Sequence, residues 1–386
     1  MKAFFSLIIA LQLAAISATD AKISRSRLIP HDLDQELTKA RQLWDNGHLV
    51  EAAALIEKRI AADSSLIPGA AVITGGNYHL VRLTSNIFPD RVGNFSPSGN
   101  KLAFARDTFF VRFDDGLFDW LEQRHTQVGY FDFSTNSEFM AQLGESEGFD
   151  PQFYTDSSLF YITGVNKSQD GGPANQLMLY DIGTGTSSKC FPLNTYYYCP
   201  VDGGVIFYDA NEAAIVKKSI DGSIQKRLYD NVGFMHYRRS LSLIRNFSAA
   251  DDIIMFQAGF SIMTTTLYGL SPVGGAARIM LDKKLVYKDV SDCCPAAIDT
   301  NDFCYLHLDK NDWDVHYHTP DQDYRLTFDG GEKSHLAVSR NCLMVAYSYR
   351  PAGSPTDESE IYILDFSRNA TIDDMIYRFK YINLHE

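Results

Sequence analysis

A short pattern of turn residues followed by an apolar run recurs six times along this chain, and it constrains the fold more than any other feature. The six copies begin at Phe95, Tyr154, Pro200, Ser248, Ile298 and Val338. Each copy is followed by a second and then a third strand-like run. Recurrence at roughly 40 to 55 residues with several strands per unit is typical of a β-propeller. The sequence therefore predicts a mainly β fold with six blades.

Each repeat contains four runs that are rich in aromatic and β-branched residues, which we interpret as four strands ordered from the inside of the ring to the outside. In the second repeat these runs are 151–154, 159–163, 176–180 and 187–191. The last repeat lacks its outermost strand, whereas the run Tyr78–Thr84 stands alone before the first repeat. Pairing of 78–84 with Glu360–Asp365 would complete the sixth blade and remove exposed sheet edges. We therefore expect a propeller over residues 77–370 that strand 78–84 closes.

Short motifs within the repeats resemble those of TolB-like, WD-repeat-related propellers. They are Arg-Leu-Thr at 82–84 and 325–327, Phe-Ser-Pro-Ser-Gly at 95–99 followed by an apolar strand, and Ile-Tyr-Ile-Leu-Asp at 361–365. Ser98 occupies the position at which the family's turn carries aspartate, and the turn motif is degraded in the other five repeats. The resemblance covers residues 78–366. It implies a six-bladed secreted propeller that binds proteins or ligands, and it implies no catalytic residues.

The amino terminus has the pattern of a secretory signal peptide. Lys2 is followed by an apolar run over Ala3–Ile16 and by the small residues Ser17 and Ala18. The alternative is an uncleaved anchor, but the run is shorter than the about 20 residues that a membrane-spanning helix needs. We expect a cleaved signal at residues 1–19 and a secreted protein, extracellular or, in a bacterium, periplasmic.

Residues 31–63 differ from the rest of the chain because their apolar positions follow helical spacing. Asn46-Gly47 interrupts this pattern in the middle. The segment predicts a helical hairpin that resembles a single tetratricopeptide unit. One such unit cannot bury its own apolar face, so we expect it to pack on the propeller or on a partner.

The charge of the chain limits its partners. The formal net charge is −13 and the isoelectric point is about 5.2. An acidic surface repels phosphate backbones and anionic lipids, which disfavours binding to nucleic acid or to membranes. No later apolar run is long enough for membrane insertion. A protein or carbohydrate ligand is the partner that we expect.

Sequons and cysteines fit an oxidising secretory compartment. Candidate glycosylation sites are Asn94, Asn166, Asn246 and Asn369. Among the six cysteines, Cys294 and Cys304 flank a hairpin near Asp299, which predicts a disulfide between them. Cys293 becomes the alternative partner if the strand register shifts by one residue.

Three groups of residues are candidates for binding a partner. Tyr196 and Tyr198 precede or begin an inner strand, where tyrosines either stack on a ligand or pack between blades. His236, Arg238 and Arg239 stand before the fourth blade, where arginines can hold a carboxylate or sulfate or simply be solvated. Trp120 belongs to an aromatic insertion, Arg106–Gln127, which we expect to be either a partner-binding loop or a cap on the propeller.

Four histidines form the only candidate metal site. His316 and His318 share one face of a predicted strand, and His307 and His335 lie near them in the chain but in separate strands. Related propellers include sugar-acid lyases that bind metal through histidines, but solvent-facing histidines are the simpler interpretation.

Two functions are consistent with these features. The leading hypothesis is a secreted, noncatalytic binding or scaffold protein without a cofactor, which engages a protein or glycan through one mouth of the propeller. The alternative is a metal-dependent, carbohydrate-active propeller enzyme of lyase type that uses a divalent metal.

Overall fold

The computed structural model describes residues 79–367, apart from short gaps, and the single residues 39, 43 and 51. The gaps are 87, 115–118, 144–146, 165–174, 231–243, 262–263, 282–294, 310–311, 321–322, 328–330, 352–353 and 355–358. The predicted signal peptide and nearly all of the predicted helical hairpin at 31–63 lie outside the described residues. Within them, no helix has the length and apolar character that crossing a membrane requires.

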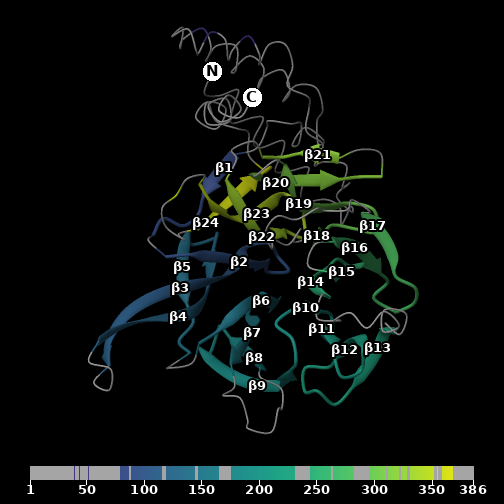
Figure 1. Cartoon of the computed structure of the whole chain (residues 1–386). Coiled ribbons are helices and arrows are strands. Elements are labelled where there is room, and N and C mark those ends of the chain that lie inside the picture. Colours follow the sequence, from purple (N-terminus) through teal and green to yellow (C-terminus); the bar gives the residue numbers. More distant parts are fainter. Residues whose placement is uncertain are drawn as a thin grey trace. The chain divides into compact units, whose positions relative to one another are not determined.

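The described strands form six four-stranded antiparallel sheets, which are arranged as the blades of a propeller (Figure 1). Blade one contains β2 (Asp90–Phe95), β3 (Lys101–Asp114), β4 (Asp119–Asp132) and β5 (Ser137–Met140); blade two contains β6 (Phe149–Thr155), β7 (Ser158–Gly164), β8 (Asn175–Asp181) and β9 (Thr186–Leu193). Blade three contains β10 (Tyr198–Val201), β11 (Gly204–Asp209), β12 (Ala214–Lys218) and β13 (Gln225–Asp230); blade four contains β14 (Arg245–Ala249), β15 (Ile254–Ser261), β16 (Thr264–Leu270) and β17 (Arg278–Leu281). Blade five contains β18 (Ala296–Ala297), β19 (Phe303–Asp309), β20 (Asp312–His318) and β21 (Asp323–Arg325); blade six contains β22 (Glu332–Val338), β23 (Met344–Arg350), β24 (Glu360–Asp365) and β1 (His79–Arg82). The mainly β, six-bladed architecture that the repeat predicts is confirmed.

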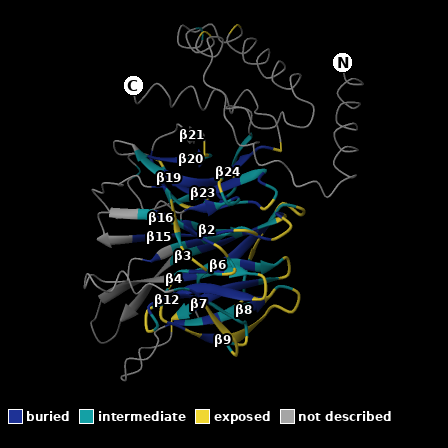
Figure 2. Ribbon diagram, turned by 90° about the vertical axis from the view of Figure 1, so that its right-hand side faces the viewer, coloured by how far each residue is buried: buried dark blue, intermediate teal, exposed yellow. Residues whose placement is uncertain are grey.

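The recurring apolar run is the second strand of each blade. This strand has a neighbour on both sides within its sheet, and the adjacent blades cover its two faces, so it carries apolar residues without alternation. Leu102–Ala105 in β3 and Leu159–Ile162 in β7 are buried along their whole length (Figure 2). Burial on both faces explains why this strand is the part of each repeat that is visible in the sequence.

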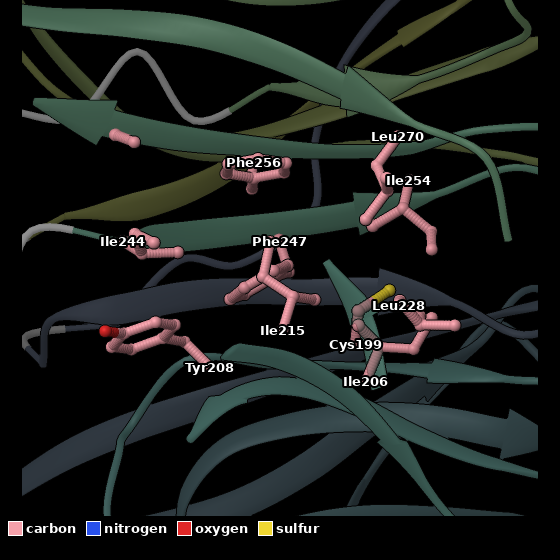
Figure 3. Packing of buried hydrophobic residues seen from close by; sticks show 11 residues of the cluster. Cys199, Ile206, Tyr208, Ile215, Leu228, Ile244, Phe247, Ile254, Phe256 and Leu270 are labelled. Carbon is pink, nitrogen blue, oxygen red and sulfur yellow. The ribbon is translucent and has the colours of Figure 1, made fainter. Parts of the chain in front are cut away.

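Apolar side chains fill the spaces between neighbouring blades. Between blades three and four, Ile206, Tyr208 and Ile215 pack against Phe247 and Phe256 (Figure 3). The rings of Phe247 and Phe256 lie 5.9 Å apart. Fully burying one such side chain contributes about 1.5–3 kcal/mol, so the apolar contacts between blades stabilise the ring.

The amino-terminal strand closes the ring. β1 lies beside β24 as the outermost strand of a blade whose other three strands come from the end of the chain, which is the pairing predicted for 78–84. The Leu83 N–H donates to the carbonyl of Ile361, and the Ile361 N–H donates to the Thr84 hydroxyl. Arg82 pairs with Glu360. Residues separated by almost the whole propeller are therefore joined in one sheet.

The second Arg-Leu-Thr motif makes the same contacts in blade five. The Leu326 N–H donates to the Val315 carbonyl, and the Val315 N–H donates to the Thr327 hydroxyl at 2.9 Å. Arg325 pairs with Asp314, which is the counterpart of Glu360, at 2.6 Å. In both copies the motif holds the outermost strand of a blade on its third strand through these bonds. The shared contacts explain why the same three residues recur at 82–84 and 325–327.

The aromatic insertion of blade one is not a separate loop. Its residues lengthen β3 and β4 into one continuous antiparallel ribbon, paired from Lys101↔Asp132 to Asp114↔Asp119. Cross-strand pairing thus continues past the edge of the blade, and whether this ribbon binds a partner or covers the propeller stays a prediction. The side chain of Trp120 lies outside the described residues.

Replacement of Thr327 tests the Arg-Leu-Thr contacts. The Thr327 hydroxyl is buried, accepts from the Val315 N–H and donates to Asp314 at 3.0 Å. Thr327→Val removes both bonds at nearly constant volume and should lower the free energy of unfolding by about 1–3 kcal/mol in urea titrations. Thr327→Ser keeps the hydroxyl and should lower the free energy of unfolding by less than Thr327→Val does. Equal losses for the two variants would contradict this account.

Candidate binding site at the channel mouth

The antiparallel order of the strands fixes which connections share a face of the ring. Within a blade, the turns between first and second strands and between third and fourth strands lie on one face, which we call the turn face. The remaining connections, including those from one blade to the next, lie on the other face, which we call the loop face. Each inner strand therefore begins at the loop face, and the six inner strands surround the axis of the ring, where propellers have their central channel (Figure 1).

Polar side chains tie the inner strands of blades one to three to one another. Asn94 on β2 donates to the Phe153 carbonyl on β6 at 3.1 Å and accepts from the Phe153 N–H at 2.5 Å. Gln152 donates to the Tyr198 carbonyl at 3.1 Å, and the Tyr198 hydroxyl donates to the Asp150 carbonyl at 2.6 Å. The inner strands of blades one to three are thus held in a fixed relation.

Three inner strands have an irregular register at residues with left-handed backbone. Asp150, Asn246 and His335 have φ angles of 46°, 54° and 51°, and each lies where the register of its strand pair shifts. Non-glycine residues rarely adopt these angles, although Asn, Asp and His do so more often than others. A bulge redirects the side chains of an inner strand, so these positions can present polar groups to the channel.

Arg91, Asp150 and His335 form a cluster of interacting groups at this mouth, from blades one, two and six. Arg91 interacts electrostatically with both Asp150 and His335. Close approach of the inner strands makes this possible: a Cβ atom on Gly93 would overlap the Pro151 carbonyl oxygen. Arg91 also pairs with the buried Asp107 at 2.6 Å.

The side chains of the cluster are surrounded by protein but keep contact with solvent. The His335 residue is exposed and Asp150 is half-buried, yet desolvation dominates the pKa shifts of both groups. Desolvation raises the pKa of Asp150 to about 7, against the opposing effects of Gln152 and Arg91. Desolvation, aided by Arg91, lowers the pKa of His335 to about 4.

At neutral pH this site presents a cationic guanidinium, a neutral imidazole and a carboxyl group near its midpoint of ionisation. Interacting groups with perturbed pKa values are typical of binding and functional sites. All three groups can donate hydrogen bonds when Asp150 is protonated. The arrangement therefore suits recognition of a ligand that carries several acceptor oxygens.

The residues predicted to bind a partner lie in different parts of the structure. Tyr196 is 57% exposed in the connection between β9 and β10, on the loop face. Tyr198 is buried between blades two and three, so its interpretation as core packing is the one the structure supports. His236, Arg238 and Arg239 lie outside the described residues.

The four predicted metal ligands are all described. The rings of His307 and His316 meet edge to face with centroids 4.9 Å apart, and His318 packs on Phe303 at 4.6 Å. His335 belongs to the channel cluster instead. Among the described residues, no group of three or more His, Cys, Asp or Glu side chains is placed to hold a metal ion. The metal hypothesis receives no support from this geometry, because His307 and His316 meet as a pair, whereas a zinc-type site needs at least three protein ligands.

The described cysteine and sequon positions serve the fold. Cys304 is a buried free thiol, so the predicted bond to Cys294, which lies outside the described residues, is not formed. The amide nitrogens of Asn94 and Asn246 donate to Phe153 and Gln257, and a glycan on either nitrogen would disturb these bonds. Asn166 and Asn369 lie outside the described residues.

Sequence reasoning missed Arg91 and Asp150. Neither belongs to a motif, and they are almost sixty positions apart in the chain. Their one local signal is position, since each is the second residue of an inner strand. His335 was identified, but as a metal ligand.

Comparisons with known proteins concern the fold. No protein-family model and no curated protein sequence matches the chain. A putative TolB from Agrobacterium tumefaciens is 13% identical with a TM-score of 0.47, covering 75% of this chain and 97% of its own. An oligogalacturonate lyase from Vibrio parahaemolyticus is 15% identical with a TM-score of 0.44, covering 74% and 93%. The calcium-binding protein regucalcin from Agrobacterium tumefaciens is 11% identical with a TM-score of 0.45, covering 76% and 94%. At these values the similarities carry no argument about the ligand of this chain.

The pH dependence of stability tests the environment of Asp150. The folded protein keeps the Asp150 proton up to about pH 7, whereas the ordinary pKa is 3.8. Wild type therefore loses stability at this group as pH rises between these values. Asp150→Asn, which suits the same backbone angle, should gain stability relative to wild type from about pH 4.5 to pH 8 in thermal unfolding.

His335→Asn is the matched comparison, because its shift has the opposite sign. The folded state lowers the pKa of His335 from 6.5 to about 4, so wild type loses stability as pH falls through this range. The stability of the His335→Asn variant should therefore rise relative to that of wild type as the pH falls. Differences from wild type that stay constant with pH would contradict the placement of these two groups.

Proposed function

We propose that this chain is a secreted, noncatalytic propeller that binds a protein or carbohydrate partner at the channel mouth of its loop face. The observation that carries the proposal is the cluster of Arg91, Asp150 and His335, whose three desolvated polar groups come from the inner strands of three blades and interact with one another through Arg91. The expectation of secretion comes from the pattern of residues 1–19.

An exposed aromatic residue on the same face supports this proposal. Tyr196 joins an apolar ring to a hydroxyl group, which suits stacking on a sugar or on a peptide side chain. The inner strands next to it are fixed by the bonds of Tyr198 with Asp150 and Gln152. A rigid framework lowers the entropy cost of binding at its rim.

Binding measurements on the two faces test the proposal. The protein without residues 1–19 is screened against glycan and peptide arrays, and the affinity of retained ligands is then measured by titration calorimetry. Tyr196→Ala should weaken binding about tenfold, as expected when a contributing interface tyrosine is removed. Ile224→Ala is the control, because Ile224 is 69% exposed in the turn between β12 and β13 on the turn face. Equal effects of both substitutions, or retention of no glycan or peptide, would contradict the proposal.

A further inference from the structure

We infer that Arg91, Asp150 and His335 bind a carboxylate group of the ligand at the channel mouth. This inference rests on the proposed function, since it names the ligand chemistry of the same site. It follows from three features: the accessible N–H groups of Arg91, the protonation state of Asp150 and the Nε2 atom of His335.

Arg91 supplies the positive charge of the site. Its guanidinium is held at 2.6 Å by Asp107, which is buried and accepts a further bond from the Thr126 hydroxyl at 2.7 Å. One side of the guanidinium is thereby fixed, while 32% of the side-chain surface remains accessible. A planar guanidinium fixed on one side presents its other N–H groups to an incoming carboxylate, which it can bind through two parallel hydrogen bonds.

Asp150 supplies a donor only while it is protonated. In that state its O–H group can donate a short hydrogen bond to a ligand carboxylate, whereas its ionised form repels one. Gln152 lies 3.4 Å and 3.5 Å from the two carboxyl oxygens, so its hold on them is weak. The bound carboxylate and Asp150 would share one proton.

His335 supplies a neutral donor beside Arg91. The Ser334 hydroxyl lies 2.9 Å from Nδ1, which leaves Nε2 for the ligand. The pKa of about 4 keeps the imidazole neutral above acidic pH, so its contribution does not vary between pH 6 and pH 8.5.

Asp150 alone should give binding its pH dependence in this range. The groups that face it are Arg91 from β2, Tyr198 and Cys199 from β10, and His335 through Arg91 from β22. Arg91 stays cationic, burial raises the pKa of Tyr198 well above its usual value, and burial raises the pKa of Cys199 to about 12. Asp150, with a pKa of about 7, is the member that changes charge. Carboxylate binding should therefore be present near pH 6 and lost near pH 8.5.

Thermal unfolding with acetate as the probe tests this inference without knowledge of the natural ligand. Acetate is compared with chloride at equal ionic strength near pH 6 and near pH 8.5, and acetamide serves as the neutral analogue. Acetate should raise the unfolding midpoint of wild type near pH 6 only, and acetamide should not. A blocked dipeptide whose one carboxylate is a glutamate side chain distinguishes a protein source from a small acid; binding of either probe supports the inference.

Variants make the test specific. Asp150→Asn keeps a donor without charge and should be stabilised by acetate at both pH values. Arg91→Gln should bind acetate at least about tenfold more weakly than wild type does near pH 6. Arg340→Gln is the matched control, because Arg340 lies exposed beside Asp251 away from the cluster and should respond as wild type does.

Two results of the acetate experiment would overturn the inference. They are the absence of stabilisation by both carboxylate probes near pH 6, and a wild-type response that persists unchanged near pH 8.5. Either result would leave the array measurements on Tyr196 unaffected, so the carboxylate inference can fail while the proposed function stands.

Discussion

The inner strand of each blade has a neighbour on only one side within its sheet, and the rest of the structure depends on how its other edge is satisfied. Backbone groups left without partners inside a protein are costly, so side chains of neighbouring blades supply the bonds. Ser348 accepts from the Val92 N–H, Asn94 bonds both backbone groups of Phe153, and Ser248 accepts from the Ala297 N–H. Polar residues on inner strands are therefore structural elements of the ring.

The candidate site is a consequence of the same constraint. The inner strands of blades one and two approach so closely that only glycine fits at position 93. This approach places Arg91 within electrostatic reach of Asp150, and the bulge at His335 adds a third group. Left-handed backbone at Asp150 and His335 costs of order 1–3 kcal/mol at each residue, and such strain is typically retained at functional sites.

The junction of blades five and six shows how buried charge can serve the fold instead. Lys333 on the inner strand β22 reaches Asp314 at 3.6 Å, and both side chains are almost completely buried. Arg325 and the Thr327 hydroxyl also contact Asp314, so its charge is balanced and hydrogen-bonded. A buried pair with these additional bonds specifies how two blades meet, and removing one partner would leave a charge in a dry interior.

The sequence by itself determined the number of blades, because the second strand of each blade is buried on both faces and so repeats as an apolar run. It also predicted ring closure, since the last repeat lacks its outermost strand and the run 78–84 stands alone before the first repeat. The insertion at 106–127 was identified, but its strand pairing was not, because cross-strand register depends on the partner strand. The channel cluster was decided by the tertiary structure alone: Arg91, Asp150 and His335 belong to three blades, and only closure of the ring brings them to one mouth. Their pKa shifts arise from desolvation by protein that is distant in sequence, which no local pattern records.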